Sequence, residues 1–215
     1  MFNLLLVEDQ PLTLVALTML LGKYFPDANI EAAPCENQAR DILRRYQKYG
    51  LQFDVAVLDL MLPAERGGNP EPSTLCADIR PLQPGAFVVH ITAYRKGQAA
   101  QIHYEQYHPV DRPGITIEKT ESNWEDLLLR KLASFRVERQ LDQFSPPQPG
   151  GGALACPVGG GSRTATMAQL TNDIRTYWKL LDTGLKDRIK GNFDIDEQRE
   201  PVGVAWGGRH VPAGD

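Results

Sequence analysis

Two short apolar runs of this sequence end in carboxylate side chains. Residues 55–58 are all apolar and lead into Asp59, and residues 4–7 are all apolar and lead into Glu8 and Asp9. A continuous apolar run of this length predicts a strand that is buried on both faces. A carboxylate at the end of such a strand can cap a turn, bind a metal ion, or act as a nucleophile that forms an aspartyl phosphate. Taken alone, these residues leave all three roles open.

The elements that would position these carboxylates alternate along the chain. Strands are predicted at about 4–7, 30–33, 55–59, 87–91 and 114–118. Helices are predicted at about 11–24 and 36–49, in a short segment from Ser73 that ends before Pro81, and from a capping box at Ser122 and Glu125 to about 141. The segment 94–113 holds one helix at most. This alternation is typical of an α/β fold with a doubly wound parallel sheet.

In such a sheet, right-handed crossovers bring the C-terminal ends of the strands to one edge. We therefore expect Glu8, Asp9 and Asp59 to meet there. Carboxylates that lie within a few ångströms of one another repel and need a cation, and a site made only of oxygen ligands favours Mg²⁺. Asp9 and Asp59 are the expected direct ligands, the backbone carbonyl of Met61 is a third candidate, and Glu8 is expected to act through water.

Two further residues follow strands and reach the same edge. Thr92 follows the fourth predicted strand and Lys119 follows the fifth. The transfer of a phosphoryl group to Asp59 requires positioning and neutralisation of negative charge. The ammonium group of Lys119 can neutralise phosphoryl oxygens together with Mg²⁺, and the hydroxyl group of Thr92 can donate a hydrogen bond to the phosphoryl group.

The order of these residues resembles the receiver domain of two-component response regulators. The resemblance covers roughly residues 2–141 and implies a flavodoxin-like (βα)5 fold with strand order 2-1-3-4-5. It also implies that a histidine kinase or a phosphotransfer protein phosphorylates Asp59, and that the chain is no enzyme beyond slow autophosphatase activity. The residues that match the family's acidic pair, phosphoacceptor, switch threonine with a small neighbour, and lysine are Glu8, Asp9, Asp59, Thr92, Ala93 and Lys119.

The sequence departs from the family at two switch positions. Thr116 stands three residues before the lysine, where the family has an aromatic switch residue, so the usual aromatic readout is expected to be absent or altered. Thr120 stands where the family has a proline after a cis bond. A cis bond before any other residue costs about 2.5–4 kcal/mol, so the loop is expected to be either trans and rearranged, or strained.

Two bulky residues bear on the lifetime of an aspartyl phosphate. Met61 and Tyr94 stand two residues beyond the acceptor and two beyond the switch threonine, where they flank the path of water to the acyl phosphate in receivers. Both side chains are large and mostly apolar. Slow self-dephosphorylation is therefore expected.

The remainder of the chain divides into three segments beyond a receiver domain at 1–144. Residues 145–164 are rich in proline and glycine and predict a flexible linker. Residues 165–191 carry apolar side chains at steps of three and four, which predicts one amphipathic helix that docks on the receiver, pairs in a homodimer, or binds another protein. Residues 192–215 are expected to be disordered. A DNA-binding output needs several helices, so DNA is not an expected partner, and the output protein stays open.

The overall composition narrows the class of protein further. The 215 residues carry a net charge of −4, which argues against non-specific binding to nucleic acid. No apolar run reaches about 18 residues, so no membrane span is expected. The chain starts directly with a strand pattern rather than a leader, and its three dispersed cysteines suit a reducing cytoplasm. Thr116 and Thr120 keep a second hypothesis open, a receiver-like scaffold that binds partners without phosphorylation.

Overall fold

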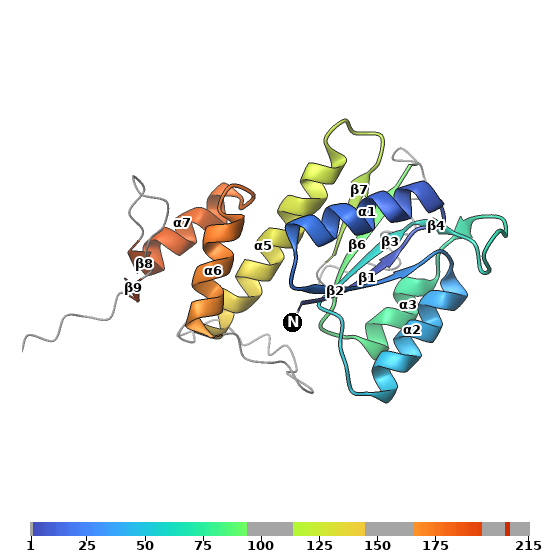
Figure 1. Ribbon diagram of the computed structural model, residues 1–215, viewed down its shortest axis with the longest axis horizontal. Coiled ribbons are helices and arrows are strands. Elements are labelled where there is room, and N and C mark those ends of the chain that lie inside the picture. The colour runs from blue at the N-terminus through green and yellow to red at the C-terminus, as the bar shows by residue number, and fades with distance from the viewer. Residues whose placement is uncertain (1, 94–113, 145–165, 195–204, 207–215) are drawn as a thin grey trace, which may run out of the picture. The chain divides into compact units, whose positions relative to one another are not determined.

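The computed structural model describes two compact units (Figure 1). The residues it describes are 2–93, 114–144, 166–194 and 205–206. The first unit includes the described residues up to 128, and the second those from 129 onward. Helix α5 (Trp124–Phe144) runs through this boundary, so its first turn belongs to one unit and the rest to the other.

The first unit is built on a five-stranded parallel sheet, as the sequence predicts. The strand order is β2-β1-β3-β6-β7, which is the order 2-1-3-4-5 when only the strands of this sheet are counted. All four neighbouring pairs are parallel. The fold class is therefore α/β with a flavodoxin-like topology. The strands are β1 (Phe2–Val7), β2 (Ala28–Ala33), β3 (Val55–Asp59), β6 (Phe87–Thr92) and β7 (Gly114–Glu118).

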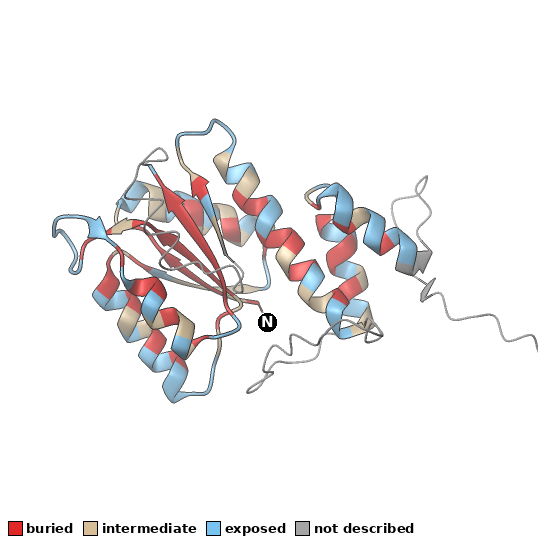
Figure 2. Ribbon diagram, turned by 180° about the vertical axis from the view of Figure 1, so that it is seen from behind, coloured by how far each residue is buried: buried red, intermediate tan, exposed pale blue. Residues whose placement is uncertain are grey.

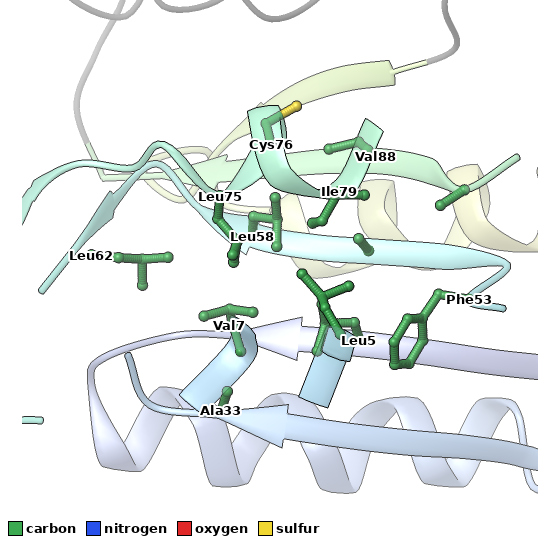
Figure 3. Packing of buried hydrophobic residues seen from close by; sticks show 14 of the residues in the cluster. Leu5, Val7, Ala33, Phe53, Leu58, Leu62, Leu75, Cys76, Ile79 and Val88 are labelled. Carbon is green, nitrogen blue, oxygen red and sulfur yellow. The ribbon is translucent and has the colours of Figure 1, made fainter. Parts of the chain in front are cut away.

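Helices cover both faces of this sheet (Figure 1). Helix α1 (Pro11–Tyr24) lies on one face, while α2 (Glu36–Lys48) and α3 (Leu75–Leu82) lie on the other. The central strands β1, β3 and β6 are buried between the helices, whose outer sides are exposed (Figure 2), while the edge strands β2 and β7 are only partly buried. On the α2 and α3 side, apolar side chains of the sheet and the two helices form one cluster (Figure 3), which includes Leu5, Val7, Leu58, Leu75, Ile79 and Val88.

Two details of the first unit differ from the sequence prediction between strands β3 and β6. The glycine and proline residues at 64–72 predict a loop, but residues 71–72 form strand β5 (Glu71–Pro72), which pairs antiparallel with β4 (Met61–Leu62). Helix α3 also continues through Pro81, where the prediction ended it. Proline removes only its own hydrogen bond in this last turn, and the amide of Gln83 still donates to the carbonyl of Ile79 at 2.7 Å.

The start of α5 also differs slightly from its prediction. The capping pattern at Ser122 and Glu125 predicted the helix start, but the first helical residue is Trp124. The amide of Leu127 donates to the carbonyl of Asn123 at 3.0 Å. Asn123 therefore occupies the cap position, one residue later than predicted.

The second unit corrects the prediction of a single helix over 165–191. The chain forms two helices there, α6 (Met167–Tyr177) and α7 (Thr183–Asn192). The side chain of Asp182 accepts a hydrogen bond from the amide of Leu185 at 2.8 Å. An aspartate in this position starts a new helix, which explains the break in spite of the continuous apolar spacing.

The apolar residues of α6 and α7 are covered within the second unit. Buried side chains come from α6, from the turn after it, from α7 and from the second part of α5. Of the three alternatives given for the apolar stripe, docking on the predicted receiver range 1–144 agrees with the structure, because Arg136 and Asp142 of α5 contact α6 and α7. The buried apolar residues of this unit are Leu132, Ala133, Val137, Leu141, Leu170, Ile174, Tyr177, Leu181, Leu185 and Ile189.

Part of the segment that was expected to be disordered forms a strand pair. Strands β8 (Phe193–Asp194) and β9 (Ala205–Trp206) are antiparallel, with Phe193 opposite Trp206. The predicted linker at 145–164 and the rest of 192–215 lie outside the described residues. In the ranges that the structure describes, no helix has the length and hydropathy needed to cross a membrane.

Candidate functional site

Three carboxylates meet at the C-terminal edge of the sheet. Glu8 and Asp9 directly follow β1, and Asp59 is the last residue of the neighbouring strand β3. Each residue offers one oxygen atom, and these atoms lie within 4.8 Å of one another. Glu8 is fully buried, Asp59 is 5% exposed, and Asp9 is partly exposed. The sequence predicted this meeting correctly.

Lys119, which directly follows strand β7, contacts two of these carboxylates. Its Nζ atom lies 2.5 Å from Oε2 of Glu8 and 2.5 Å from Oδ2 of Asp59. Its backbone amide donates to the carbonyl of Thr92 at 2.7 Å, which fixes the residue at the end of β6. The lysine is therefore held by both its backbone and its side chain.

The charges at this edge are not balanced. Burial raises the pKa of Glu8 above its usual value, although the contact with Lys119 opposes this shift. Burial and then the charge of Asp59 raise the pKa of Asp9. Burial alone would lower the pKa of Lys119, but Asp59 and Glu8 outweigh burial and raise it. Three carboxylates thus share one ammonium group, and the site favours an additional cation.

The donor set fits the magnesium ion that the sequence predicts. All candidate ligands are oxygen atoms, which Mg²⁺ prefers, and Asp9 keeps access to solvent. Both oxygens of Glu8 already accept hydrogen bonds, one from Lys119 at 2.5 Å and one from the amide of Gln10 at 3.2 Å. The role of Glu8 at the metal through water stays a prediction.

The loop after the acceptor also contacts the acceptor. The amide of Met61 donates to Oδ1 of Asp59 at 3.0 Å. The role of the Met61 carbonyl as a metal ligand, and that of its side chain in shielding the acyl phosphate, stay predictions. Tyr94, the other residue expected to control access of water, lies outside the described residues.

Thr92 ends strand β6, next to the acceptor strand. Asp59 is paired with Ile91, so Thr92 lies one residue further along the same edge. Thr92 is 1% exposed, while Ala93 after it is exposed. This places the threonine where the sequence predicted it, and its hydrogen bond to a phosphoryl group stays a prediction.

The two altered switch positions lie on the surface. Thr116 is exposed in β7, opposite His90 in the register of the sheet. Thr120 is exposed as well, and the described residues contain no cis peptide bond. The peptide bond between Lys119 and Thr120 is therefore trans, and a rearrangement of this loop stays a prediction. A turn in which the amide of Glu121 donates to the carbonyl of Glu118 at 3.1 Å follows the lysine-bearing strand.

One residue near the acceptor was not identified from the sequence. Glu36, the first residue of α2, is 7% exposed, and its carboxylate bonds to residues that follow β5. An acidic residue in the first turn of a helix is normally a solvated partner of the helix dipole, so its type and position gave no signal.

Comparisons with known proteins found similar solved structures at low sequence identity, and several of them are receiver domains. No family model and no curated protein matches it. A CheY-like response regulator receiver domain from Methanospirillum hungatei is 18% identical with a TM-score of 0.49, over 66% of this chain and 98% of the other. The receiver domain of a DNA-binding response regulator from Colwellia psychrerythraea is 20% identical with a TM-score of 0.49, over 66% and 99%.

A third similar structure was determined with a ligand. RcsB from Salmonella enterica, solved bound to a promoter in the presence of the phosphomimetic BeF3⁻, is 18% identical with a TM-score of 0.48, over 63% of this chain and 99% of the other. These solved structures belong to the class that the sequence resembles. At such identities no activity can be transferred, and the functional proposal depends on the side chains described above.

Proposed function

We propose that this chain is a two-component response regulator whose receiver unit is phosphorylated on Asp59 with the help of Mg²⁺. The single observation that supports this most strongly is the sheet edge itself. There, the carboxylates of Glu8, Asp9 and Asp59 lie within 4.8 Å of one another, and Lys119 contacts Asp59 at 2.5 Å. A structural cap would not need two further carboxylates and a buried ammonium group beside it.

The proposed reaction transfers a phosphoryl group to a carboxylate oxygen of Asp59. A bond forms between that oxygen and phosphorus, while the bond from phosphorus to the donor's histidine nitrogen, or to the acyl oxygen of a small donor, breaks. The leaving group keeps the electron pair. Asp9 and Asp59, with Glu8 through water, would hold Mg²⁺, which neutralises phosphoryl oxygens. Lys119 contributes its positive charge at the same edge, and Thr92 its hydroxyl group.

The proposed partners are proteins. A histidine kinase or a phosphotransfer protein would supply the phosphoryl group, and the output would be a change in protein contacts rather than DNA binding. Helix α1 supports a protein partner because it exposes apolar side chains on its outer side: Leu12 is 87% exposed, Met19 71% and Val15 58%. Its only charged residue is Lys23. A cytoplasmic location and the lack of enzymatic turnover belong to the same proposal.

A second candidate function is a scaffold that binds partners without phosphorylation. Two specific observations favour it, the exposed threonines at positions 116 and 120, because neither can serve as the usual aromatic or proline switch residue. In this case the chain would retain the charged residues at the sheet edge, but phosphorylation there would no longer change the surface that binds partners.

The test is to incubate the full chain with Mg²⁺ and acetyl phosphate and to measure its intact mass. We expect the wild type to gain one phosphoryl group and Asp59→Asn to gain none. Beryllofluoride, a phosphomimetic that transfers no phosphoryl group, should bind with the same dependence on Asp59 in calorimetry. Absence of both the adduct and Mg²⁺ binding in the wild type would support the scaffold instead.

A further inference from the structure

Glu36 makes bonds that leave its own helix. Its Oε1 atom accepts hydrogen bonds from Oγ of Ser73 at 2.7 Å and from the amide of Thr74 at 2.8 Å. Its Oε2 atom pairs with Arg40 at 2.7 Å, and Arg40 also pairs with Asp78 of α3 at 2.8 Å. The carboxylate therefore holds the chain where it leaves strand β5 and enters α3.

The backbone of the same helix end holds the connection between the two strands of the hairpin, just after β4. The amide of Glu36 donates to the carbonyl of Pro63 at 3.1 Å, and the amide of Asn37 donates to the carbonyl of Ala64 at 3.0 Å. Pro63 directly follows β4. The first turn of α2 thus binds the chain just after each of the two strands of the hairpin, at 63–64 after β4 and at 73–74 after β5. We call this set of contacts the α2 clasp.

The clasped hairpin contacts the acceptor directly. At its first strand, the amide of Met61 donates to Oδ1 of Asp59 at 3.0 Å. At its far end, the amide of Ser73 donates to the carbonyl of Leu60, the residue after the acceptor, at 2.8 Å. Two hydrogen bonds in sequence therefore connect Glu36 to the backbone beside Asp59, through Ser73.

We propose that Glu36 is a positioning residue for Asp59. It holds the hairpin so that the Met61 amide fixes the orientation of the Asp59 carboxylate for metal binding and phosphoryl transfer. The phosphorylation part rests on the proposed function. A purely helix-stabilising role would require only the pair with Arg40 and the helix dipole, and it would leave the buried bonds to Ser73 and Thr74 unexplained.

The experiment compares three variants of the full chain. Glu36→Ala removes the acceptor atoms, Glu36→Gln keeps an oxygen that can accept from Ser73 and Thr74, and Tyr46→Phe is the matched control. Tyr46 lies further along α2, and its hydroxyl accepts from Asn29 at 2.6 Å, far from the hairpin in sequence. Its replacement weakens the attachment of the same helix without touching the clasp.

Two measurements are made on each variant. Hydrogen exchange of the amides of Met61, Ser73 and Thr74 reports the clasp without any phosphorylation, and the rate with acetyl phosphate reports its consequence. We expect Glu36→Ala to speed exchange of these amides and to slow phosphorylation about tenfold, since small misplacements of reacting groups have effects of that size or larger. Glu36→Gln should recover most of both, and Tyr46→Phe should leave both at wild-type values.

The outcomes separate this inference from the proposed function. Should the wild type not be phosphorylated at all, the proposed function fails, while the exchange data still decide whether Glu36 holds the hairpin. Exchange in Glu36→Ala that matches Tyr46→Phe would overturn the inference, as would equal phosphorylation rates in these two variants. Failure of Glu36→Gln to recover either measurement would also overturn it, because the charge rather than the hydrogen bonds would then be what matters.

Discussion

Asp59 in the first unit and Asp173 in the second are both buried carboxylates beside a cationic side chain, with 5% and 4% of their surface exposed. Asp173 receives two bonds from one guanidinium group, from Nε of Arg136 at 2.6 Å and from Nη2 at 3.0 Å. Gln140 donates to it as well, at 2.5 Å, and the ring of Tyr177 lies 5.4 Å from the guanidinium carbon. One negative charge here meets one positive charge in a fork geometry.

At the sheet edge, the positive charge does not balance the negative charge. The ammonium group of Lys119 serves both Glu8 and Asp59, and Asp9 adds a third negative charge. The comparison teaches that burial of a carboxylate does not by itself indicate function. A balanced pair such as Arg136 and Asp173 fixes α5 to α6, whereas an excess of negative charge leaves a need that a metal ion can satisfy.

Among substitutions that test this difference between Asp59 and Asp173, the largest expected effect is the loss of phosphorylation when Asp59 is replaced. Asp59→Asn removes the nucleophilic oxygen, and we expect complete loss of the adduct with acetyl phosphate in intact mass. Asp54→Asn is the control, because Asp54 precedes the same strand and its side chain accepts from the amide of Asn3 at 2.8 Å, which asparagine can still do. Loss of the adduct in Asp54→Asn as well would contradict a specific role of Asp59.

The next effect concerns stability of the second unit. Asp173→Ala leaves the charge of Arg136 buried without its partner, which typically costs about 3–5 kcal/mol. We expect faster hydrogen exchange across α6 and a lower unfolding midpoint, with phosphorylation of Asp59 unchanged. Lys179→Ala, a change at an exposed residue just after α6, is the control and should alter neither. Unchanged exchange in Asp173→Ala would mean that the pair does not hold α5 to α6.

A smaller effect is expected when the excess charge is reduced. The pKa of Asp9 is raised by burial and by Asp59, so its charged form is disfavoured in the folded state at neutral pH. This cost in folding free energy disappears only when the pH falls below the pKa of Asp9 in the folded state. A neutral asparagine at this position should therefore raise the melting temperature at neutral pH without Mg²⁺. Asp9→Asn should also lower the affinity for Mg²⁺ about tenfold or more, because even the loss of an outer-sphere partner has an effect of this size.

Calorimetric titration with Mg²⁺ and melting curves with and without it measure these two effects of Asp9→Asn. We expect the melting temperature without Mg²⁺ to rise and the affinity for Mg²⁺ to fall. A general loss of folding would instead lower both. A variant that melts lower than wild type without Mg²⁺ would contradict the charge imbalance on which the metal site is proposed.

The smallest effect is expected on the lifetime of the phosphorylated state. The combined change Met61→Asn and Tyr94→Glu replaces two large, mostly apolar side chains with polar ones, so water should reach the acyl phosphate more readily. We expect a shorter half-life of the isolated phosphoprotein, measured by the decay of its intact-mass adduct. The Met61 amide still donates to Asp59 in this variant, and an unchanged half-life would refute slow self-dephosphorylation as a property of these side chains.

Several features of the fold were predictable because their signals are local. Apolar runs mark the strands, and proline and glycine positions mark helix ends, as at Pro11 and at Gly50 with its φ of 63°. The meeting of Glu8, Asp9 and Asp59 followed from a general rule about crossovers in parallel sheets. Together these signals located the candidate site.

Other features had no local signal. Continuous apolar spacing over 165–191 favours one helix, but Asp182 caps a new helix, and Tyr177 of α6 and Arg188 of α7 contact residues of α5. A loop composition at 64–72 does not reveal that β5 pairs with β4, or that the first turn of α2 holds the chain after each of these strands. In each case, packing between distant segments decided among conformations that the local sequence permits about equally.

The sequence by itself determined the strands of the sheet and which residues stand at their ends, because side-chain period and chain connectivity are properties of neighbouring residues. The order of the strands was expected only from the resemblance to receiver domains. Only the tertiary structure decided that Lys119 bridges Glu8 and Asp59, and that Glu36 reaches the chain after β5. These contacts join residues 111, 60 and 37 positions apart. Distances of a few ångströms between such residues depend on how whole elements pack, which no local pattern encodes.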